Sequence, residues 1–212
     1  MAFTNYRSID DVVKKHKLVF VPGEILAPAR DAPPFDDYFK SELNFTLHNL
    51  RAGRSEIGSS ELILFPILRE VWKSYVDEIA LFTHEPLRYD DDLTGVPDYF
   101  ICRKSKYGQT IPEVPFLLIV EAKLDDFEKA WGQCLAQMLA AQKLNGTPDM
   151  PVYGMATNGN AWQFGRLVGR VFTQDPSAIA LATLEPLNQQ MHAYMRACQA
   201  LAAQYEQPVT TP

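Results

Sequence analysis

Residues 116–123 read FLLIVEAK, and this stretch decides how the rest of the 212-residue chain is interpreted. Its first five residues are apolar on both faces of a strand, a pattern typical of strands in the middle of a sheet. Glu121 and Lys123 end the run two residues apart, so they point to the same face. Burying such charges costs several kcal/mol unless they are paired or bind a metal, so this strand end holds a polar site or reaches solvent.

A second acidic residue, Asp98, follows a turn about twenty residues upstream of this strand end and opens an expected neighbouring strand. Two carboxylates that converge from neighbouring strands suit a hard divalent cation such as Mg²⁺, which takes oxygen ligands and keeps several waters. A plainer interpretation stays open, in which Asp98 is a turn residue and Glu121 and Lys123 form a solvated strand end.

The hydrophobic pattern, with its order of helices and strands, predicts an α/β fold with a layered arrangement. Ser55 is expected to cap a long helix whose apolar stripe includes Ile57, and Pro66 is expected to bend that helix. Helices are predicted over residues 36–51, 56–75, 127–144 and 185–205, and strands over 79–87, 99–103, 116–122, 152–157, 162–168 and 170–173. We expect a single domain made of an N-terminal extension with a helix packed on the core (1–54), a core (55–175), and a C-terminal helix with a polar tail (176–212).

Composition limits the classes of function. The net charge of −6 and pI near 5.2 exclude a globally basic nucleic-acid-binding surface, so any nucleic-acid contact must use a local patch. Three widely spaced cysteines predict buried thiols without a disulfide framework or zinc site. No apolar run is long enough for a membrane span and the first residues do not resemble a signal peptide, so a cytoplasmic protein is expected.

Five segments occur in an order that resembles the PD-(D/E)XK nuclease superfamily. They are SEIGSSELILFPILREVW, GVPDYFI, FLLIVEAK, KAWGQCLAQMLAAQ and YGMATNGNAWQFGRL. The chain resembles in particular the N-terminal nuclease domains of type I restriction subunits and related stand-alone, uncharacterised bacterial and cyanobacterial proteins. The resemblance covers about residues 55–167. It implies an α/β fold with a restriction-endonuclease-like core, in which helices flank a central mixed β-sheet. It also implies hydrolysis of phosphodiester bonds in DNA with Mg²⁺ or Mn²⁺.

The resemblance also implies roles for particular residues. Asp98 and Glu121 match the family's metal ligands, the carbonyl of Ala122 completes the protein's share, and Lys123 matches the catalytic lysine. In that chemistry the metal lowers the pKa of a bound water, and the lysine offsets charge that develops on the phosphate. The expected products are a 5′-phosphate and a 3′-hydroxyl.

Many family members add a glutamate from the helix before the first strand, and here two candidates stay open. Glu56 lies in the family-like S-E start, although a glutamate there also simply favours a helix N-terminus. Glu61 falls on the apolar stripe, about 40° from Ile57 and Tyr75 on an ideal helix.

A glutamine on the following helix often faces the family's site as well. Gln133 and Gln137 are one turn apart and share a helix face, and Gln133 matches the family register slightly better. The alternative is that both are solvent-facing amides.

Two further classes of function compete with a nuclease. The first is a non-catalytic binding module that uses the nuclease fold for nucleic-acid or protein partners, and the intact Lys123 argues against it. The second is a structural protein in which Glu121 and Lys123 form an ordinary ion pair. Cleavage of both strands of a duplex would suit a homodimer, but the apolar face of the last helix is better explained by packing on its own sheet.

Overall fold

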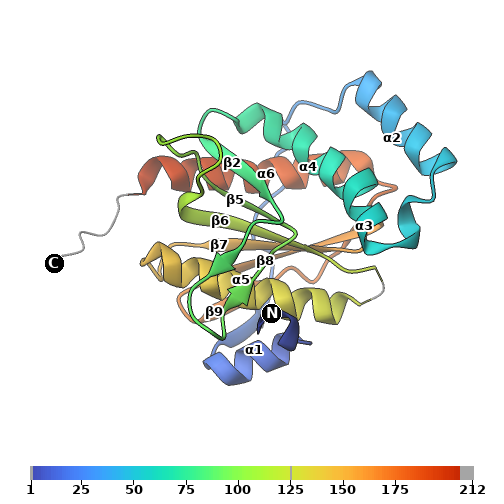
Figure 1. The fold of residues 1–212 in the computed structure, drawn as a ribbon. Coiled ribbons are helices and arrows are strands. Elements are labelled where there is room, and N and C mark those ends of the chain that lie inside the picture. Colours follow the sequence, from blue (N-terminus) through green and yellow to red (C-terminus); the bar gives the residue numbers. More distant parts are fainter. Residues whose placement is uncertain (1, 125, 206–212) are drawn as a thin grey trace.

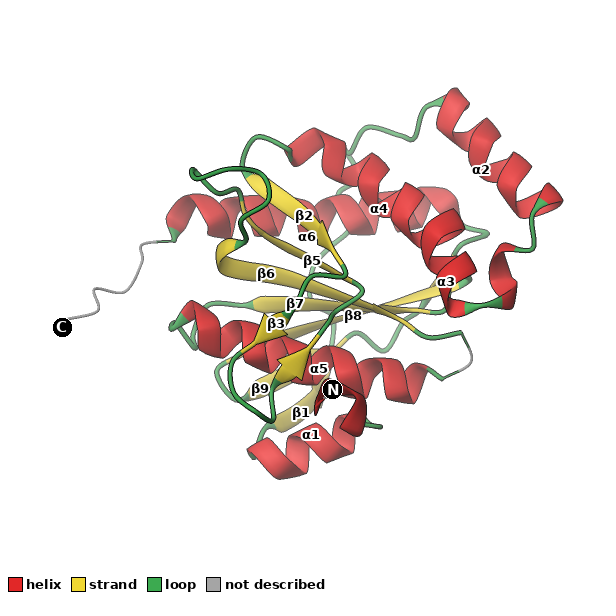
Figure 2. Ribbon diagram, viewed as in Figure 1, coloured by secondary structure: helices red, strands yellow, loops and turns green. Residues whose placement is uncertain are grey.

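The computed structural model describes residues 2–124 and 126–205, and it is an α/β fold with one large mixed sheet between two helical layers (Figures 1 and 2). The sheet order is β1-β9-β8-β7-β6-β5-β2, with β10 paired to β8. Its strands are β1 (Val19–Pro22), β2 (Ile79–Thr83), β5 (Tyr99–Arg103), β6 (Glu113–Ala122), β7 (Val152–Thr157), β8 (Ala161–Val168), β9 (Val171–Gln174) and β10 (Ile179–Ala180).

Helices cover both faces of this sheet. α5, with α1 packed against it, covers one face, and α4 and α6 cover the other, with α2 and α3 in the same layer (Figure 1). The helical segments are η1 (Ala2–Asn5), α1 (Ile9–His16), α2 (Asp37–Asn49), η2 (Ala52–Arg54), α3 (Glu56–Ser59), η3 (Ser60–Leu64), α4 (Phe65–Trp72), η4 (Lys73–Tyr75), α5 (Phe127–Asn145) and α6 (Leu184–Gln204).

The apolar strand β6 lies inside the sheet, as its sequence predicts. It pairs in parallel with β7 and antiparallel with β5, so the sheet is mixed. Leu118 and Val120 face the core beneath α4 and α6, while Ile119 faces the core beneath α5. Both faces are fully buried because a helical layer covers each of them.

The N-terminal residues add elements that the sequence pattern did not reveal. β1 pairs in parallel with β9 at the edge of the sheet, and α1 packs on α5. β1 reads VFVP, which lacks the alternation of apolar and polar residues that would mark a half-buried strand, and all four residues are exposed. The predicted helix over 36–51 is confirmed as α2, where the Asp36 side chain accepts a hydrogen bond from the Phe39 N–H.

The predicted continuous helix over 56–75 is wrong in its middle. Ser55 caps α3 as predicted, but Ser60–Leu64 form a π-helical turn before α4, and Pro66 lies in the first turn of α4. The wider turn changes which side chains face inward, because its hydrogen bonds join residues five apart rather than four. Ile57 is therefore 70% exposed rather than part of the apolar stripe.

The predicted strand over 79–87 is also two elements. β2 ends at Thr83, and His84 adopts a left-handed backbone conformation with φ of 52°. β3 (Leu87–Arg88) then pairs with β4 (Thr94–Gly95) in a separate two-stranded sheet. The remaining predicted strands and helices are present, and α5 ends at Gly146 in a left-handed cap.

The apolar face of α6 packs on its own sheet, as expected. Its members Leu187, Met191, Tyr194, Met195 and Cys198 are fully buried. All three cysteines are free and buried, as predicted. No helix in the described residues combines the length and apolar character that a bilayer crossing requires. The part of the predicted polar tail beyond residue 205 lies outside the described residues.

Candidate functional site

The pairing of β5 with β6 brings the first two carboxylates together. Tyr99 at the start of β5 lies opposite Val120 near the end of β6, so Asp98 lies beside the end of β6. Asp98 Oδ2 accepts a hydrogen bond from the backbone N–H of Ala122 at 2.7 Å. The Asp98 side chain is 21% exposed, so it lies at the rim of the site.

Glu121 lies at the buried centre of the site, with its side chain only 4% exposed. Its Oε1 lies 3.0 Å from Lys123 Nζ, and its Oε2 accepts a hydrogen bond of 2.9 Å from Gln137 Nε2. One carboxylate therefore joins β6 to α5 and to the chain just after the strand. The alternative of a solvated strand end is wrong for Glu121, because β7 and α5 cover it.

Lys123 holds its ammonium group among oxygen atoms. Besides Glu121, Nζ donates to the carbonyl of Ala122 at 2.9 Å and lies 3.4 Å from Glu56 Oε2. Its backbone N–H donates to the carbonyl of Thr157 on β7 at 3.0 Å. The side chain is only 12% exposed, so the contacts orient the ammonium group toward the carboxylates rather than toward bulk water.

Burial and mutual repulsion perturb the carboxyl groups. Burial raises the pKa of Glu121 to about 7, and the nearby charge of Asp98 adds to the shift. Burial also raises the pKa of Asp98, although the Ala122 N–H and Lys123 oppose it. Burial alone would lower the pKa of Lys123, but the charges of Glu121, Asp98 and Glu56 outweigh it and raise that pKa.

The cluster contains carboxylate and carbonyl oxygens, the kind of atom that hard divalent cations bind. With Asp98, Glu121 and Glu56 ionised, the cluster carries more negative than positive charge, because Lys123 is its one ammonium group. Among the described residues no three His, Cys, Asp or Glu side chains form a metal-binding group. Asp98, Glu121 and the Ala122 carbonyl thus supply a partial set, and Mg²⁺ commonly completes such a set with water.

Of the two candidate glutamates, Glu56 is the one whose side chain contacts Lys123 in the described part of the chain. Glu56 is the first residue of α3, and its half-exposed side chain reaches Lys123. Glu61 lies in the π-helical turn and is exposed, and its side chain makes no hydrogen bond or ion pair with any described residue. The angular argument for Glu61 assumed an uninterrupted α-helix, which the π-helical turn removes.

The two glutamines are both buried in α5, so the alternative of solvent-facing amides is wrong. Gln137 contacts Glu121, whereas Gln133 makes no side-chain hydrogen bond with any described residue. The residue one turn further along the helix is thus the one that touches the site. Gln137 Oε1 is buried and has no hydrogen-bond partner in the described part of the chain.

Sequence reasoning missed His84 at the rim of the site. Its backbone N–H donates to the carbonyl of Asp98 at 2.9 Å, and Nε2 lies 3.8 Å from Asp98 Oδ1. The ring meets Tyr99 edge-on, with centroids 5.7 Å apart. No spacing in the sequence marks His84, because only the chain reversal after β2 brings it to Asp98.

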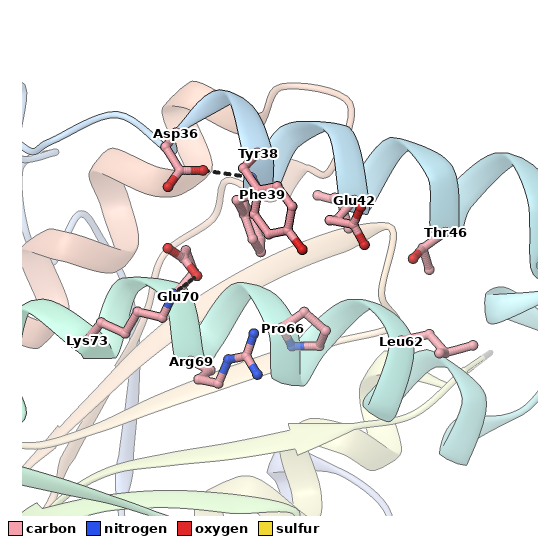
Figure 3. A pocket seen from close by; sticks show the side chains of 11 residues that line it. Asp36, Tyr38, Phe39, Glu42, Thr46, Leu62, Pro66, Arg69, Glu70 and Lys73 are labelled. Carbon is pink, nitrogen blue, oxygen red and sulfur yellow. Dashed lines mark hydrogen bonds and ion pairs between the residues drawn. The ribbon is translucent and has the colours of Figure 1, made fainter.

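A cleft of about 280 Å³ between α2 and α4 is separate from the cluster, and none of the sequence-predicted site residues lines it (Figure 3). Glu42 from α2 and Arg69 from α4 point toward the space between the helices (Figure 3). Glu70 and Lys73 form an ion pair of 2.6 Å at one end. The mixed charges of this cleft give no reason to extend the candidate site into it.

Comparison with known proteins adds little to this geometry. No family model matches the sequence, and no curated protein is significantly similar to it. One similar solved structure is the type IIG restriction endonuclease BpuSI, at 15% identity and a TM-score of 0.40. That match covers 72% of this chain and 17% of the BpuSI chain. A likeness this weak carries no argument about activity, so the functional argument depends on the site itself.

Proposed function

We propose that this protein is a metal-dependent endonuclease of the PD-(D/E)XK type that hydrolyses phosphodiester bonds in DNA. The observation that carries the proposal is the convergence of Asp98, Glu121 and Lys123 at the end of the central strand. Asp98 comes from a different sequence motif than Glu121 and Lys123, yet the pairing of β5 with β6 puts all three in one cluster of charged and hydrogen-bonded groups.

Asp98, Glu121 and the Ala122 carbonyl would hold Mg²⁺ or Mn²⁺. The bound cation would polarise the scissile phosphate and lower the pKa of a water molecule. The chain's own residues perform the remaining tasks. Gln137 orients Glu121 by hydrogen bonding to Oε2, and Glu56 helps to hold the ammonium group of Lys123 at the same place. Lys123 would stabilise the negative charge that builds up on the phosphate oxygens.

The proposed reaction is hydrolysis of the bond between phosphorus and the 3′-oxygen. The oxygen of water bonds to phosphorus, the bond to the 3′-oxygen breaks, and that oxygen takes a proton. The products are a 5′-phosphate and a 3′-hydroxyl. Glu61 and Gln133 touch none of the groups that carry this proposal, so we assign neither of them a part in it. The three buried free thiols favour a reducing compartment, and we place the protein in the cytoplasm.

A cleavage assay with paired lysine variants tests the proposal. Purified wild type, Lys123→Ala and Lys143→Ala are incubated with supercoiled plasmid and with labelled single-stranded and duplex oligonucleotides, in Mg²⁺, Mn²⁺ or EDTA. Lys143 is an exposed lysine at the far end of α5, so its variant controls for charge and for contaminating nucleases. Lys123→Ala is expected to cut at least about 100-fold more slowly, while Lys143→Ala keeps wild-type activity.

Two results would overturn the proposal. Cleavage that is equally fast in Lys123→Ala would show that another group or a contaminant is responsible. Wild-type protein that cuts no substrate in either metal would favour a binding module that keeps the site without turnover.

A further inference from the structure

A groove runs beside the candidate site along α2. It consists of two hollows of about 460 and 540 Å³ that share Leu47 and Asn160 among their lining residues. The smaller hollow reaches the short helix η2, and the larger one reaches the start of α6. Its walls come from α2 and η2 on one side and from the segments that follow β7 and β10 on the other.

The charge of this groove is opposite in sign to that of the whole chain. Among the described residues that line it, the charged ones are Lys40, Arg51 and Arg54, with no carboxylate. Lys40 lies 3.3 Å from Asp37 on its own helix. Arg51 and Arg54 are exposed, and their side chains form no ion pair or hydrogen bond with any described residue. Two arginines are therefore available to an anionic ligand, on a chain whose net charge is −6.

The cationic end of the groove is close along the chain to a residue of the candidate site. Arg54 is followed by Ser55, the cap of α3, and then by Glu56, whose Oε2 lies 3.4 Å from Lys123 Nζ. The opposite wall is held in place, because Ser59 on α3 donates a hydrogen bond to the carbonyl of Asn158. Arg54 is two positions along the chain from Glu56, which contacts Lys123.

We propose that this groove binds a single strand of DNA and leads its sugar-phosphate backbone to the cluster. The inference rests on the proposed function and adds the path of the substrate. A run of phosphates matches cations placed along α2 and η2, and a positively charged groove that follows the backbone is the usual way to bind a single strand. Leu47 and Leu50, both exposed, line the groove beside the arginines and offer apolar surface to the bases.

Binding without cleavage tests the groove directly. The fluorescence anisotropy of a labelled DNA strand of about 20 nucleotides is titrated with protein in EDTA, over a series of salt concentrations. Arg51→Glu and Arg54→Glu are compared with Lys106→Glu, an equal charge change at the opposite end of β5 and β6. Each arginine-to-glutamate variant is expected to bind the strand at least about fivefold more weakly. The plot of log K against log salt is expected to become less steep, by about 0.7 in the magnitude of its slope. Lys106→Glu is expected to behave like wild type.

The outcomes separate this proposal from the proposed function. If wild type cuts DNA but both arginine variants keep its affinity and salt slope, the groove proposal is overturned and the nuclease stands. If the arginine variants lose binding but wild type cuts nothing in Mg²⁺ or Mn²⁺, the groove stands and the nuclease fails. Wild type that binds no single strand, or that binds a duplex more tightly than a single strand, overturns the groove proposal. Far-ultraviolet circular dichroism confirms that each variant is folded.

Discussion

Glu121 is a buried residue whose negative charge costs stability, although the proposed function needs that charge. It ends an apolar central strand, is almost fully buried, and lies close enough to Asp98 for the two charges to repel each other. Lys123 and Gln137 each satisfy one of its oxygens, but a buried ion pair offsets only part of the cost of removing charge from water. Groups kept at such a cost are often functional, because selection tolerates them in exchange for activity.

We predict that Glu121→Gln raises the stability of the metal-free protein while it abolishes cleavage. The substitution removes a buried negative charge beside Asp98, and the unpartnered Oε1 of Gln137 can accept a hydrogen bond from the new amide after a side-chain flip. The raised pKa of Glu121 means that the folded protein favours a neutral side chain there, so at pH values above about 7 the free energy of unfolding is expected to rise by about 1 kcal/mol, measured by urea denaturation in EDTA.

Glu113→Gln is the matched control, because Glu113 lies at the other end of β6 and its carboxylate is paired with Arg103 at 2.6 Å. The same change there should not raise stability. If Glu121→Gln proves less stable than Glu113→Gln, then Glu121 is a net stabilising group and the conflict inferred above does not exist.

At the scale of elements, the site depends on how α3 sits against the turn between β7 and β8. Gly159 in that turn has φ of 85°, and a Cβ atom there would collide with Ser59 Oγ. Ser60 Oγ and Tyr99 Oη, 2.7 Å apart, join the same helical region to β5. The contacts hold the start of α3, and with it Glu56, over the end of β6.

Gly159→Ala is expected to lower the free energy of unfolding by about 2 kcal/mol, because it adds both a steric collision and a left-handed conformation that alanine disfavours. Gly169→Ala controls for the conformation alone, since Gly169 has φ of 55° but a Cβ there would meet nothing closer than Asp149 Oδ1, at an ordinary contact distance of 4.0 Å. Urea denaturation should show the larger loss for Gly159→Ala. Adding Ser59→Ala should recover part of that loss, and equal losses at the two glycines would contradict the close contact.

The contact between α6 and η4 predicts a dependence of stability on pH. His192 on α6 is buried with Nδ1 2.7 Å from Tyr75 Oη, and Arg196 and Asp31 are the charged groups near it. Burial lowers the pKa of His192 below its ordinary 6.5, and the Arg196 cation adds to the shift. The unfolded chain therefore binds this proton more readily than the folded protein does.

His192 thus contributes its full stability above about pH 6.5 and loses it as the pH falls from there toward its lowered pKa. We expect the stability difference between wild type and His192→Gln to shrink over that interval, as measured by urea denaturation at a series of pH values. Other titrating groups, such as His16, are shared by both proteins and cancel. A difference that stays constant or grows as the pH falls would contradict a lowered pKa for His192.

At the scale of the whole molecule, charge is distributed unevenly. The chain is acidic overall, the cluster at the end of β6 concentrates carboxylates, and the neighbouring groove carries cations. Such a distribution suits a protein that attracts a divalent cation at one point and a polyanion beside it. The cations of the groove would contact DNA locally, although the whole chain has a net charge of −6.

We predict that Mg²⁺ or Mn²⁺ raises the thermal stability of wild type but not of Asp98→Asn. A ligand that binds only the folded state stabilises it by about 1.4 kcal/mol at ten times its Kd. Asp98→Asn keeps an oxygen that can accept from the Ala122 N–H, so the pairing of β5 and β6 should survive. Thermal unfolding is followed at matched ionic strength with NaCl as the control. An equal shift in both proteins would place the metal elsewhere.

The order of elements and the core of the site follow from local signals in the sequence. The apolar run before Glu121 marks a central strand, and Ser55 and Gly146 mark helix ends through hydrogen bonding and backbone conformation. Asp98, Glu121 and Lys123 stand at the beginning or end of neighbouring strands in the sequence, and the pairing of β5 with β6 brings them together. Such features depend on neighbours along the chain, so a pattern in the sequence can reveal them.

By itself, the sequence determined the α/β layering and the motif-bearing strand ends, because hydrophobic periodicity and caps are local properties. Only the tertiary structure decided that Glu56 rather than Glu61, and Gln137 rather than Gln133, contacts the cluster. The rotation of a helix about its axis is set by packing across the sheet, and the π-helical turn changed that rotation. The position of His84 and the arginine groove likewise depend on residues distant in sequence, which meet only when the layers pack.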